Sequence, residues 1–530
     1  MTKQNTIDRI RIFLDGYGLY VVVLIAMLPA ILLRDFTPDN ELRYVSIAAE
    51  SLREGTFFAF TNHGIAYADK PPLYLWICMA GYALFGNHCL PFVTLFSVLP
   101  AFVITEIMAR WSAPSLPERW RLPAKLMLLT STLFIGLALT MRMDMLMAMF
   151  IVLALRMFWR RYNGDESPRT FYLFPIYLFL ALFTKGPYGI LIPLGAIVAF
   201  LIVKKKLRTF THFWGWRCWC ILIILSALWF AAVYLEGGTQ YLDNLLFKQT
   251  VGRAVKSFAH NEPFYFYLIS IWYSIAPWSP AVIGAIIGAL VVRRHRIELP
   301  ETALFFITTA ISSTALLSCF SAKLSVYLLP AFPFFIYGGA SCIALFSRSG
   351  WIKAALALPA TIFLLLAAVL PFVAKIPVIT KFTNHLPALL IVGVSFLAVS
   401  GLVALILLYR RNASLPGAIT SLGTGFLLFL FFSGFCIGDF NDHIGYRDLA
   451  EKTDAAIKRT GLQNVYTYRV RRPENMDVYL GRDIIIIDDH EDGTVTYPPK
   501  ETGLLLMREK DLKGTEEILG KSGKYVIIKN

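Results

Sequence analysis

Stretches of about 20 mostly apolar residues recur along this chain and constrain its fold more than any other feature. The hydrocarbon core of a bilayer is about 30 Å thick, so a helix needs roughly 20 apolar residues to cross it. We predict thirteen such helices, at residues 12–33, 91–109, 126–141, 145–159, 171–184, 186–203, 218–235, 266–292, 303–320, 324–346, 354–374, 387–408 and 417–437. Of the 530 residues, 57% are hydrophobic and only 16% are charged, which excludes an ordinary soluble enzyme.

The basic residues predict the orientation of these helices. Short loops on one side of the predicted membrane contain Arg119, Arg121, Lys125, Arg160, Arg161, Lys204, Lys205, Lys206, Arg208, Arg293, Arg294, Arg296, Arg410 and Arg411. An excess of Lys and Arg marks cytoplasmic loops, so this side and the N-terminus are assigned to the cytoplasm. The net charge of +15 therefore reflects topology, and we expect no nucleic-acid partner.

The last 90 or so residues differ in character from the rest. A charged run at residues 448–459 is typical of a helix, and the runs at 465–470, 483–487, 503–507 and 524–529 are typical of strands. We predict a transmembrane region at residues 1–437, followed by a small soluble α/β domain at 438–530. An odd number of crossings would place this domain outside, in the periplasm of a bacterium. Its role in binding an acceptor or in covering the site is a hypothesis.

Polar residues gather in the first outer loop, residues 34–90. It contains TPDNELRY at residues 37–44 and YADKPPLY at residues 67–74. Long ordered loops between helices are uncommon unless they are functional. Asp39 and Glu41 follow the first helix, where a carboxylate could reach a substrate at the membrane surface. A solvated helix cap is the structural alternative.

Further charged residues belong to outer turns that are far apart in the sequence. Arg142 and Asp144 lie in one turn and Lys185 in the next. A later turn contains Lys323, and an outer loop contains Lys248, Arg253, Lys256 and His260. Ionisable groups at membrane depth are costly and usually functional or paired, although a single Lys can also be an interfacial anchor. Because cations bind phosphate and carboxylates orient or deprotonate nucleophiles, the set predicts a site for an anionic lipid and a polar acceptor.

These motifs together resemble the bacterial dolichyl-phosphate-mannose protein mannosyltransferase family, which includes the aminoarabinose transferase of lipid A. The resemblance is carried by residues 38–44, 69–72, 144, 184–186, 260–264 and 323–327. It implies a GT-C fold, a sugar donor on a polyprenyl phosphate, and transfer on the periplasmic side of the bacterial inner membrane. The C-terminal region matches by position alone.

The resemblance also implies roles for individual residues. Lys70 and Arg253 match positions that hold the lipid phosphate, with Lys185 and Lys323 as further candidates. Asp144 matches a second acidic site. Candidate substrate-binding residues are Arg43, Tyr44, Asp69, His260 and Tyr327.

The acidic pair of the first loop departs from the family pattern. The family carries Asp-Glu before x-Arg-Tyr, and strict alignment of Arg43 and Tyr44 places Asn40 and Glu41 there. Either Asp39 takes the catalytic place through a one-residue shift, which we favour, or Glu41 does. No cofactor is predicted firmly, although Asp39, Glu41 and Asp144 could together bind a divalent cation.

We therefore predict a glycosyltransferase that moves a sugar from a polyprenyl-phosphate donor to lipid A or to a protein Ser or Thr. A flippase for the same lipid-linked sugar is one alternative, since intramembrane charges also mark translocation paths. Against it, the chain shows no internal repeat and its charges cluster at one membrane face. A ligase that moves whole lipid-linked oligosaccharides is a second alternative.

Overall fold

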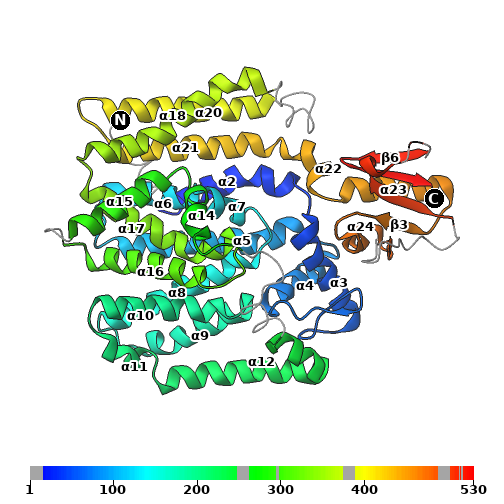
Figure 1. Ribbon diagram of the computed structural model, residues 1–530, viewed down its shortest axis with the longest axis horizontal. Helices are drawn as coiled ribbons and strands as arrows, with labels where there is room; N and C mark the ends of the chain where they lie inside the picture. Colours follow the sequence, from blue (N-terminus) through cyan, green and yellow to red (C-terminus); the bar gives the residue numbers. More distant parts are fainter. Residues whose placement is uncertain are drawn as a thin grey trace.

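The computed structural model describes residues 16–247, 262–293, 298–373, 388–487, 502–512, 514 and 517–529. Long helices lie side by side in a bundle, and a small sheet lies beyond one end of that bundle (Figure 1). The bundle helices are α2 (Gly18–Leu33), α5 (Leu90–Ser112), α6 (Arg121–Leu129), α7 (Thr132–Ala138), α8 (Met143–Tyr162), α9 (Pro168–Lys185), α10 (Tyr188–Val203), α11 (Phe210–Phe213), α12 (Trp216–Asp243), α14 (Phe266–Ser274), α15 (Ser279–Arg293), α16 (Glu301–Ser318), α17 (Phe332–Leu345), α18 (Gly350–Val373), α20 (Ala388–Tyr409) and α21 (Leu415–Gly434).

Within the described ranges, seven helices are long and apolar enough to cross a membrane, or nine if each of two bent pairs forms one span. The bent pairs are α2 with residues 38–54, at 75°, and residues 118–129 with α7, at 66°. The chain is thus a helical, polytopic membrane protein, as predicted. The predicted count of thirteen crossings is not confirmed, because several of the predicted segments form short, broken or charged helices. Residues 266–292, for example, form α14 and α15 with a break between them.

Aromatic side chains fill the centre of the bundle. The indole ring of Trp111 on α5 is buried and lies 5.1 Å from the ring of Phe306 and 6.1 Å from that of Trp159, centroid to centroid. Large side chains on the outer helices α12, α18 and α20 are instead exposed, as expected where lipid replaces water as the solvent.

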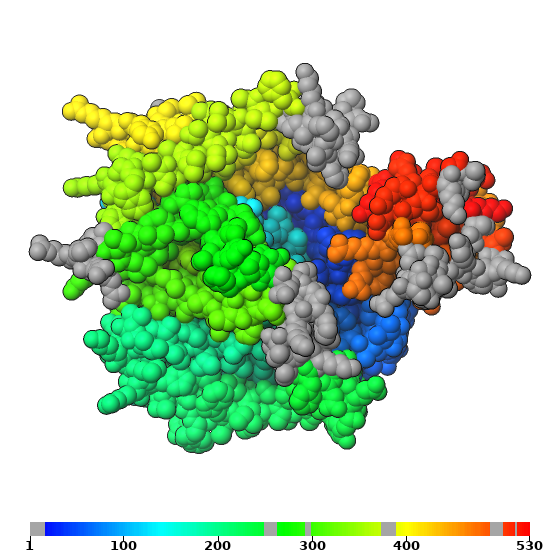
Figure 2. Space-filling view, viewed as in Figure 1, coloured from blue at the N-terminus to red at the C-terminus, as the bar shows by residue number. Residues whose placement is uncertain are grey.

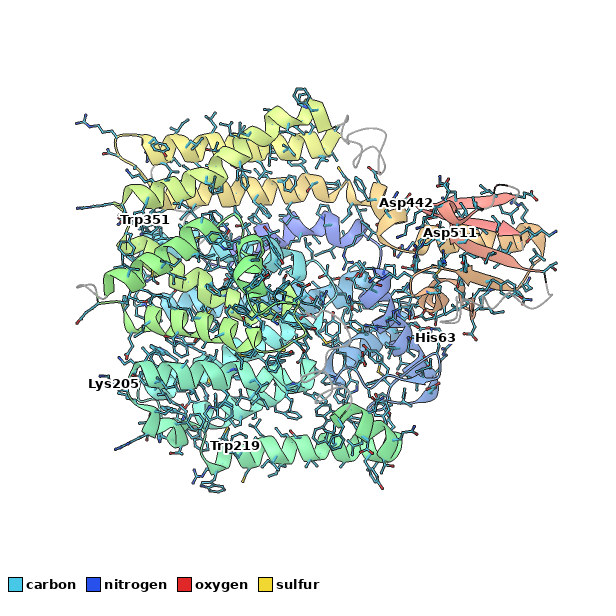
Figure 3. The ribbon with its side chains drawn as sticks, in the orientation of Figure 1. His63, Lys205, Trp219, Trp351, Asp442 and Asp511 are labelled. Atoms are coloured by element: carbon cyan, nitrogen blue, oxygen red, sulfur yellow. The ribbon has the colours of Figure 1, made fainter. Side chains whose placement is uncertain are left out.

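The first loop forms an ordered cap at one end of the bundle. A π-helical turn, Pro38–Leu42, leads into α3 (Arg43–Glu54), and α4 (Leu73–Phe85) follows. Between them, strands β1 (Thr61–Asn62) and β2 (Ile65–Ala66) pair antiparallel. The two residues that join these strands, His63 and Gly64, have φ of 54° and 73°, which is the geometry of a type I′ hairpin turn. The hairpin fixes the position of His63, which faces the C-terminal region (Figure 3).

The C-terminal region forms a five-stranded sheet with the strand order β4-β3-β5-β7-β6. Its elements are α22 (Asn441–Ile444), α23 (Arg447–Thr460), β3 (Val465–Tyr468), α24 (Asp477–Leu480), β4 (Ile485–Ile487), β5 (Leu504–Arg508), β6 (Ile518–Ser522) and β7 (Tyr525–Lys529). β3 pairs parallel with β4 and β5, whereas β7 pairs antiparallel with β5 and β6. The predicted helix and four strands are present. β6 was missed because it is an edge strand, largely exposed and without a buried apolar pattern.

Candidate active site

The acidic residues of the first loop lie in a π-helical turn, Pro38–Leu42. The backbone N–H of Leu42 donates to the carbonyl of Thr37, five residues earlier, at 3.0 Å. A single π-helical turn holds one residue more than the matching α-helical turn and is frequent at functional sites. The turn separates the two candidate carboxylates, because Glu41 is buried whereas Asp39 is partly exposed.

The Glu41 carboxylate is enclosed by donors. Both guanidinium nitrogens of Arg34 donate to it at 2.7 Å in a two-pronged ion pair. It also accepts from the backbone N–H and hydroxyl of Thr37, at 2.8 and 2.9 Å, and from the backbone N–H of Met141 at 2.6 Å. Such a saturated carboxylate ties the first loop to the turn before α8 and has little capacity left to accept a proton from a substrate.

Asp39 has a different partner, from the far end of the chain. Nε of Arg471, in the loop after β3, lies 2.6 Å from a carboxylate oxygen of Asp39, and both side chains are substantially exposed. The structure therefore leaves Asp39 as the more accessible of the two acids.

Asp144 lies at the beginning of α8 and is buried between two cations. Lys185, the last residue of α9, donates to one carboxylate oxygen, and Nε of Arg142 donates to the other at 3.2 Å. The ammonium of Lys185 also lies 4.7 Å from the ring centroid of Tyr327, within cation–π range. Gly189 permits the tight turn from α9 into α10, since a Cβ there would lie 2.4 Å from the backbone of Ala181.

A cavity of about 430 Å³ opens beside this cluster. Four of the predicted site residues line it: Asp69, Lys70, Lys185 and Tyr327. Its other walls are mostly apolar. They come from the first loop, from α9, α10 and α12 with the residues next to them, and from the segment after α16, namely Ala68, Pro71, Leu182, Gly186, Pro187, Tyr188, Leu191, Trp229, Phe230, Leu245, Leu246, Phe320 and Ala322. Two ammonium groups within apolar walls are suited to an anionic head attached to a hydrocarbon chain.

Other predicted site residues lie around the cavity. The guanidinium of Arg43 lies 5.3 Å from the ring centroid of Tyr67 and 5.9 Å from that of buried Tyr44. Lys323 is buried and donates to the carbonyl of Glu262 at 2.7 Å, so it braces a loop beside the cavity. Arg253 and His260 lie outside the described residues.

The three acids do not form a shared metal site. Asp39, Glu41 and Asp144 are each paired with a different cation, from Arg471, Arg34 and Lys185 respectively. Among the residues that the structure describes, no group of three or more His, Cys, Asp or Glu side chains is placed to hold a metal ion.

Sequence reasoning missed the residues that organise this region. Arg34 immediately follows the first apolar helix. A basic residue at a membrane boundary is as typical of an interfacial anchor as of an ion-pair partner for Glu41. Trp229 and Phe230 read as ordinary membrane residues. No sequence signal connected Arg471 with a residue more than 400 positions earlier.

Comparison with known proteins shows which family the chain resembles. The sequence profile of the family described as dolichyl-phosphate-mannose-protein mannosyltransferase matches residues 69–231. An uncharacterized protein of Aquifex aeolicus is 29% identical over 56% of this chain and 57% of its own length. The undecaprenyl phosphate-alpha-4-amino-4-deoxy-L-arabinose arabinosyl transferase of Edwardsiella ictaluri is 26% identical over 59% of this chain and 56% of its own. The family resemblance predicted from the sequence is confirmed.

The fold of this chain resembles that of a solved structure. The crystal structure of ArnT from Cupriavidus metallidurans bound to undecaprenyl phosphate superimposes with a TM-score of 0.74, at 18% identity, over 97% of this chain and 98% of that one. At that identity the likeness shows the GT-C fold alone. The sequence matches span a little over half the length of the first two curated relatives.

Proposed function

We propose that this chain is a glycosyltransferase that takes a sugar from a polyprenyl-phosphate donor and passes it to lipid A or to a protein Ser or Thr. The observation that carries the proposal is the cavity in which Lys70 and Lys185 lie among apolar walls. A phosphate could reach the two ammonium groups while its prenyl chain lies along Trp229 and Phe230. The named transferases and the lipid-bound relative support this donor class.

The cavity suggests how the reaction would proceed. An acceptor oxygen attacks C1 of the sugar, the bond between C1 and the phosphate oxygen breaks, and polyprenyl phosphate departs with the negative charge. Lys70 and Lys185 stabilise that charge, with Arg253 as a further candidate, and fixed cations of this kind can each lower a barrier by a few kcal/mol. Asp144 holds Lys185 in place.

Asp39 is proposed as the general base. A Ser or Thr hydroxyl must lose its proton during attack, and Asp39 would accept it. A phosphate group of lipid A is already ionised, so in that case the carboxylate would only orient the acceptor. The structural role of Glu41 favours Asp39 over Glu41 for this function.

The arrangement in the membrane is part of the same proposal. Residues 1–437 would form the transmembrane region, with thirteen crossings in the inner membrane, and residues 438–530 a soluble periplasmic domain. Basic Lys205 and aromatic Trp351 lie at the end of the bundle opposite His63 and Asp442, which supports placing the site on the periplasmic side (Figure 3).

Transfer of label from a polyprenyl-phosphate sugar in proteoliposomes tests the proposal. We expect label in lipid A or protein with the wild type, loss with Lys185→Met and Lys70→Met, and normal transfer with Lys205→Met, an exposed lysine at the far end. Lys70→Met is included because it alters a loop residue and leaves the buried Asp144–Lys185 pair intact. Movement of the labelled lipid across the bilayer without transfer to any acceptor would favour the flippase instead.

A further inference from the structure

The C-terminal region makes direct contact with the proposed base. In the space-filling view its residues, in orange and red, lie against the first-loop residues, in blue (Figure 2). We infer, on the basis of the proposed function, that Arg471 is a positioning residue: its ion pair with Asp39 holds the carboxylate in the orientation that the reaction needs. The C-terminal region would then contribute a positioning residue to the active site.

The loop that carries Arg471 is built as a fixed support. Arg469 and Arg472 have φ of 54° and 53°, which is uncommon for residues other than glycine and persists only where the surroundings enforce it. The hydroxyl of buried Tyr446 donates to the carbonyl of Arg471. Pro473 then begins the next helical turn. The backbone of Arg471 is therefore held from both sides.

Arg471 reaches across to the first loop, where it pairs with Asp39. Arg469 lies 3.6 Å from Asp511, and Arg472 lies 3.7 Å from Glu474, so each of these two arginines has an ion-pair partner within the C-terminal region. The three side chains share one loop and are all exposed, yet differ in partner. Arg472 therefore offers a matched control.

The C-terminal region is docked at the base of the turn that carries Asp39. The buried Asp35 carboxylate accepts from the backbone N–H of Arg447 at 2.9 Å and from the hydroxyl of Tyr479. The Asn441 side chain accepts from the backbone N–H of Asp35 at 2.9 Å and donates to the carbonyl of Leu33 at 2.7 Å. Asp35 lies four residues before Asp39, so these bonds fix the distance over which Arg471 must reach.

A second contact between the first loop and the C-terminal region prevents that region from rotating about its attachment at Asp35. Ser46 on α3 donates to the carboxylate of Asp477 on α24 at 3.1 Å, and Nε2 of His63 lies 3.8 Å from the same carboxylate. With two separate attachments to the first loop, the C-terminal region presents Arg471 to Asp39 in one orientation.

The exposure of the pair argues for a role in catalysis more than in stability. Exposed ion pairs contribute only about 0–1 kcal/mol to folding. Holding a catalytic group within a narrow range of positions has a far larger effect, since a misplacement of about 1 Å can reduce a rate by about 100-fold. Loss of the Arg471 guanidinium should therefore leave the fold intact and impair turnover.

Steady-state transfer kinetics with labelled polyprenyl-phosphate sugar provide the test. We expect Arg471→Gln to lower kcat by about 10- to 100-fold with KM for the donor within about 2-fold of wild type. Arg471→Lys should recover part of kcat, because it restores the charge without the planar fork. Arg472→Gln should behave as wild type, and all three variants should unfold at the wild-type temperature.

The outcomes separate the two proposals. A wild-type chain that transfers no sugar would defeat the proposed function. An active wild type with unchanged or higher kcat in Arg471→Gln would instead overturn the positioning role and leave the proposed function standing. Equal losses of kcat in Arg471→Gln and Arg472→Gln would also overturn it, because they would point to the charge of the whole loop.

Discussion

Two sets of ion pairs lie near each other in this molecule and differ in their surroundings. Where the first loop meets the end of the bundle, the side chains of Glu41 and Arg34 are 2% and 5% exposed, and those of Asp144 and Lys185 are 2% and 7% exposed. At the junction with the C-terminal region, the side chains of Asp39 and Arg471 are 39% and 73% exposed. Glu41 and Asp39 are two residues apart, so one turn of chain supplies an acid to each set.

The difference in exposure indicates that the two sets of ion pairs have different roles. A buried charge is tolerated only while it is paired, so each buried pair commits the backbone around it to one arrangement. An exposed pair constrains the fold weakly, and its acid remains accessible to a substrate. We therefore expect the buried pairs to determine where the helix ends lie and the junction pair to affect turnover.

The largest expected effect is on stability, from removal of a buried acid. Glu41→Ala would leave the Arg34 guanidinium buried without its carboxylate and should lower the free energy of unfolding by about 3–5 kcal/mol. Asp39→Ala, two residues away, should lower it by less than about 1 kcal/mol. Thermal unfolding of both variants in nanodiscs measures the contrast, and equal losses would contradict the division between buried and exposed pairs.

A double-mutant cycle examines the second buried pair. Asp144→Asn and Lys185→Met should each destabilise the protein, because each leaves an uncompensated partner. The double variant should be more stable than the sum of the single losses predicts, by up to about 3 kcal/mol of coupling. Strictly additive losses would mean that Arg142, and not Lys185, is the principal partner of Asp144.

The sequence was informative where a physical constraint is local. Apolar length predicted the helices, and the cost of ionisable groups at membrane depth singled out Asp144 and Lys185, which lie in contact. The choice between Asp39 and Glu41 could not be made from spacing alone. It depends on which carboxylate the folded chain leaves accessible, and that follows from the burial and the ion-pair partners of Glu41 and Asp39.

Long-range docking was beyond sequence reasoning. The contact between Asp39 and Arg471 depends on how the C-terminal sheet lies on the first loop, and that placement follows from Asp35, Asn441 and Ser46, which are ordinary polar residues in sequence. The family pattern offered no help here, because the C-terminal region matched only by position. Arg253 and His260, outside the described residues, remain predictions.

The docking at Asp35 can be loosened with one methyl group. A Cβ at Gly445 would lie 2.0 Å from a carboxylate oxygen of Asp35, whereas a Cβ at Gly438 would meet nothing within 4 Å. Gly445→Ala should therefore weaken docking by about 1–3 kcal/mol, the usual effect of overpacking, and Gly438→Ala should not. Hydrogen exchange at the backbone N–H of Arg447, which donates to Asp35, measures the effect. Unchanged protection in Gly445→Ala would show that Asp35 does not determine the docking.

The smallest expected effect is a pH dependence at the second attachment. Burial raises the pKa of Asp477, and the nearby charge of His63 and the hydrogen bond from Ser46 oppose that shift only in part. A raised pKa means that the folded state binds this proton more tightly than the unfolded state, so the contribution of Asp477 to stability is lost as pH rises from its unfolded pKa to its folded pKa.

On acidification from neutral pH toward about 4, near the unfolded pKa of Asp, the wild type should gain stability relative to Asp477→Asn. Melting temperatures of the two proteins across that range measure the difference. A relative loss for the wild type would show that attraction to His63 outweighs burial, and the second attachment would then behave like the exposed pair at Asp39 and Arg471.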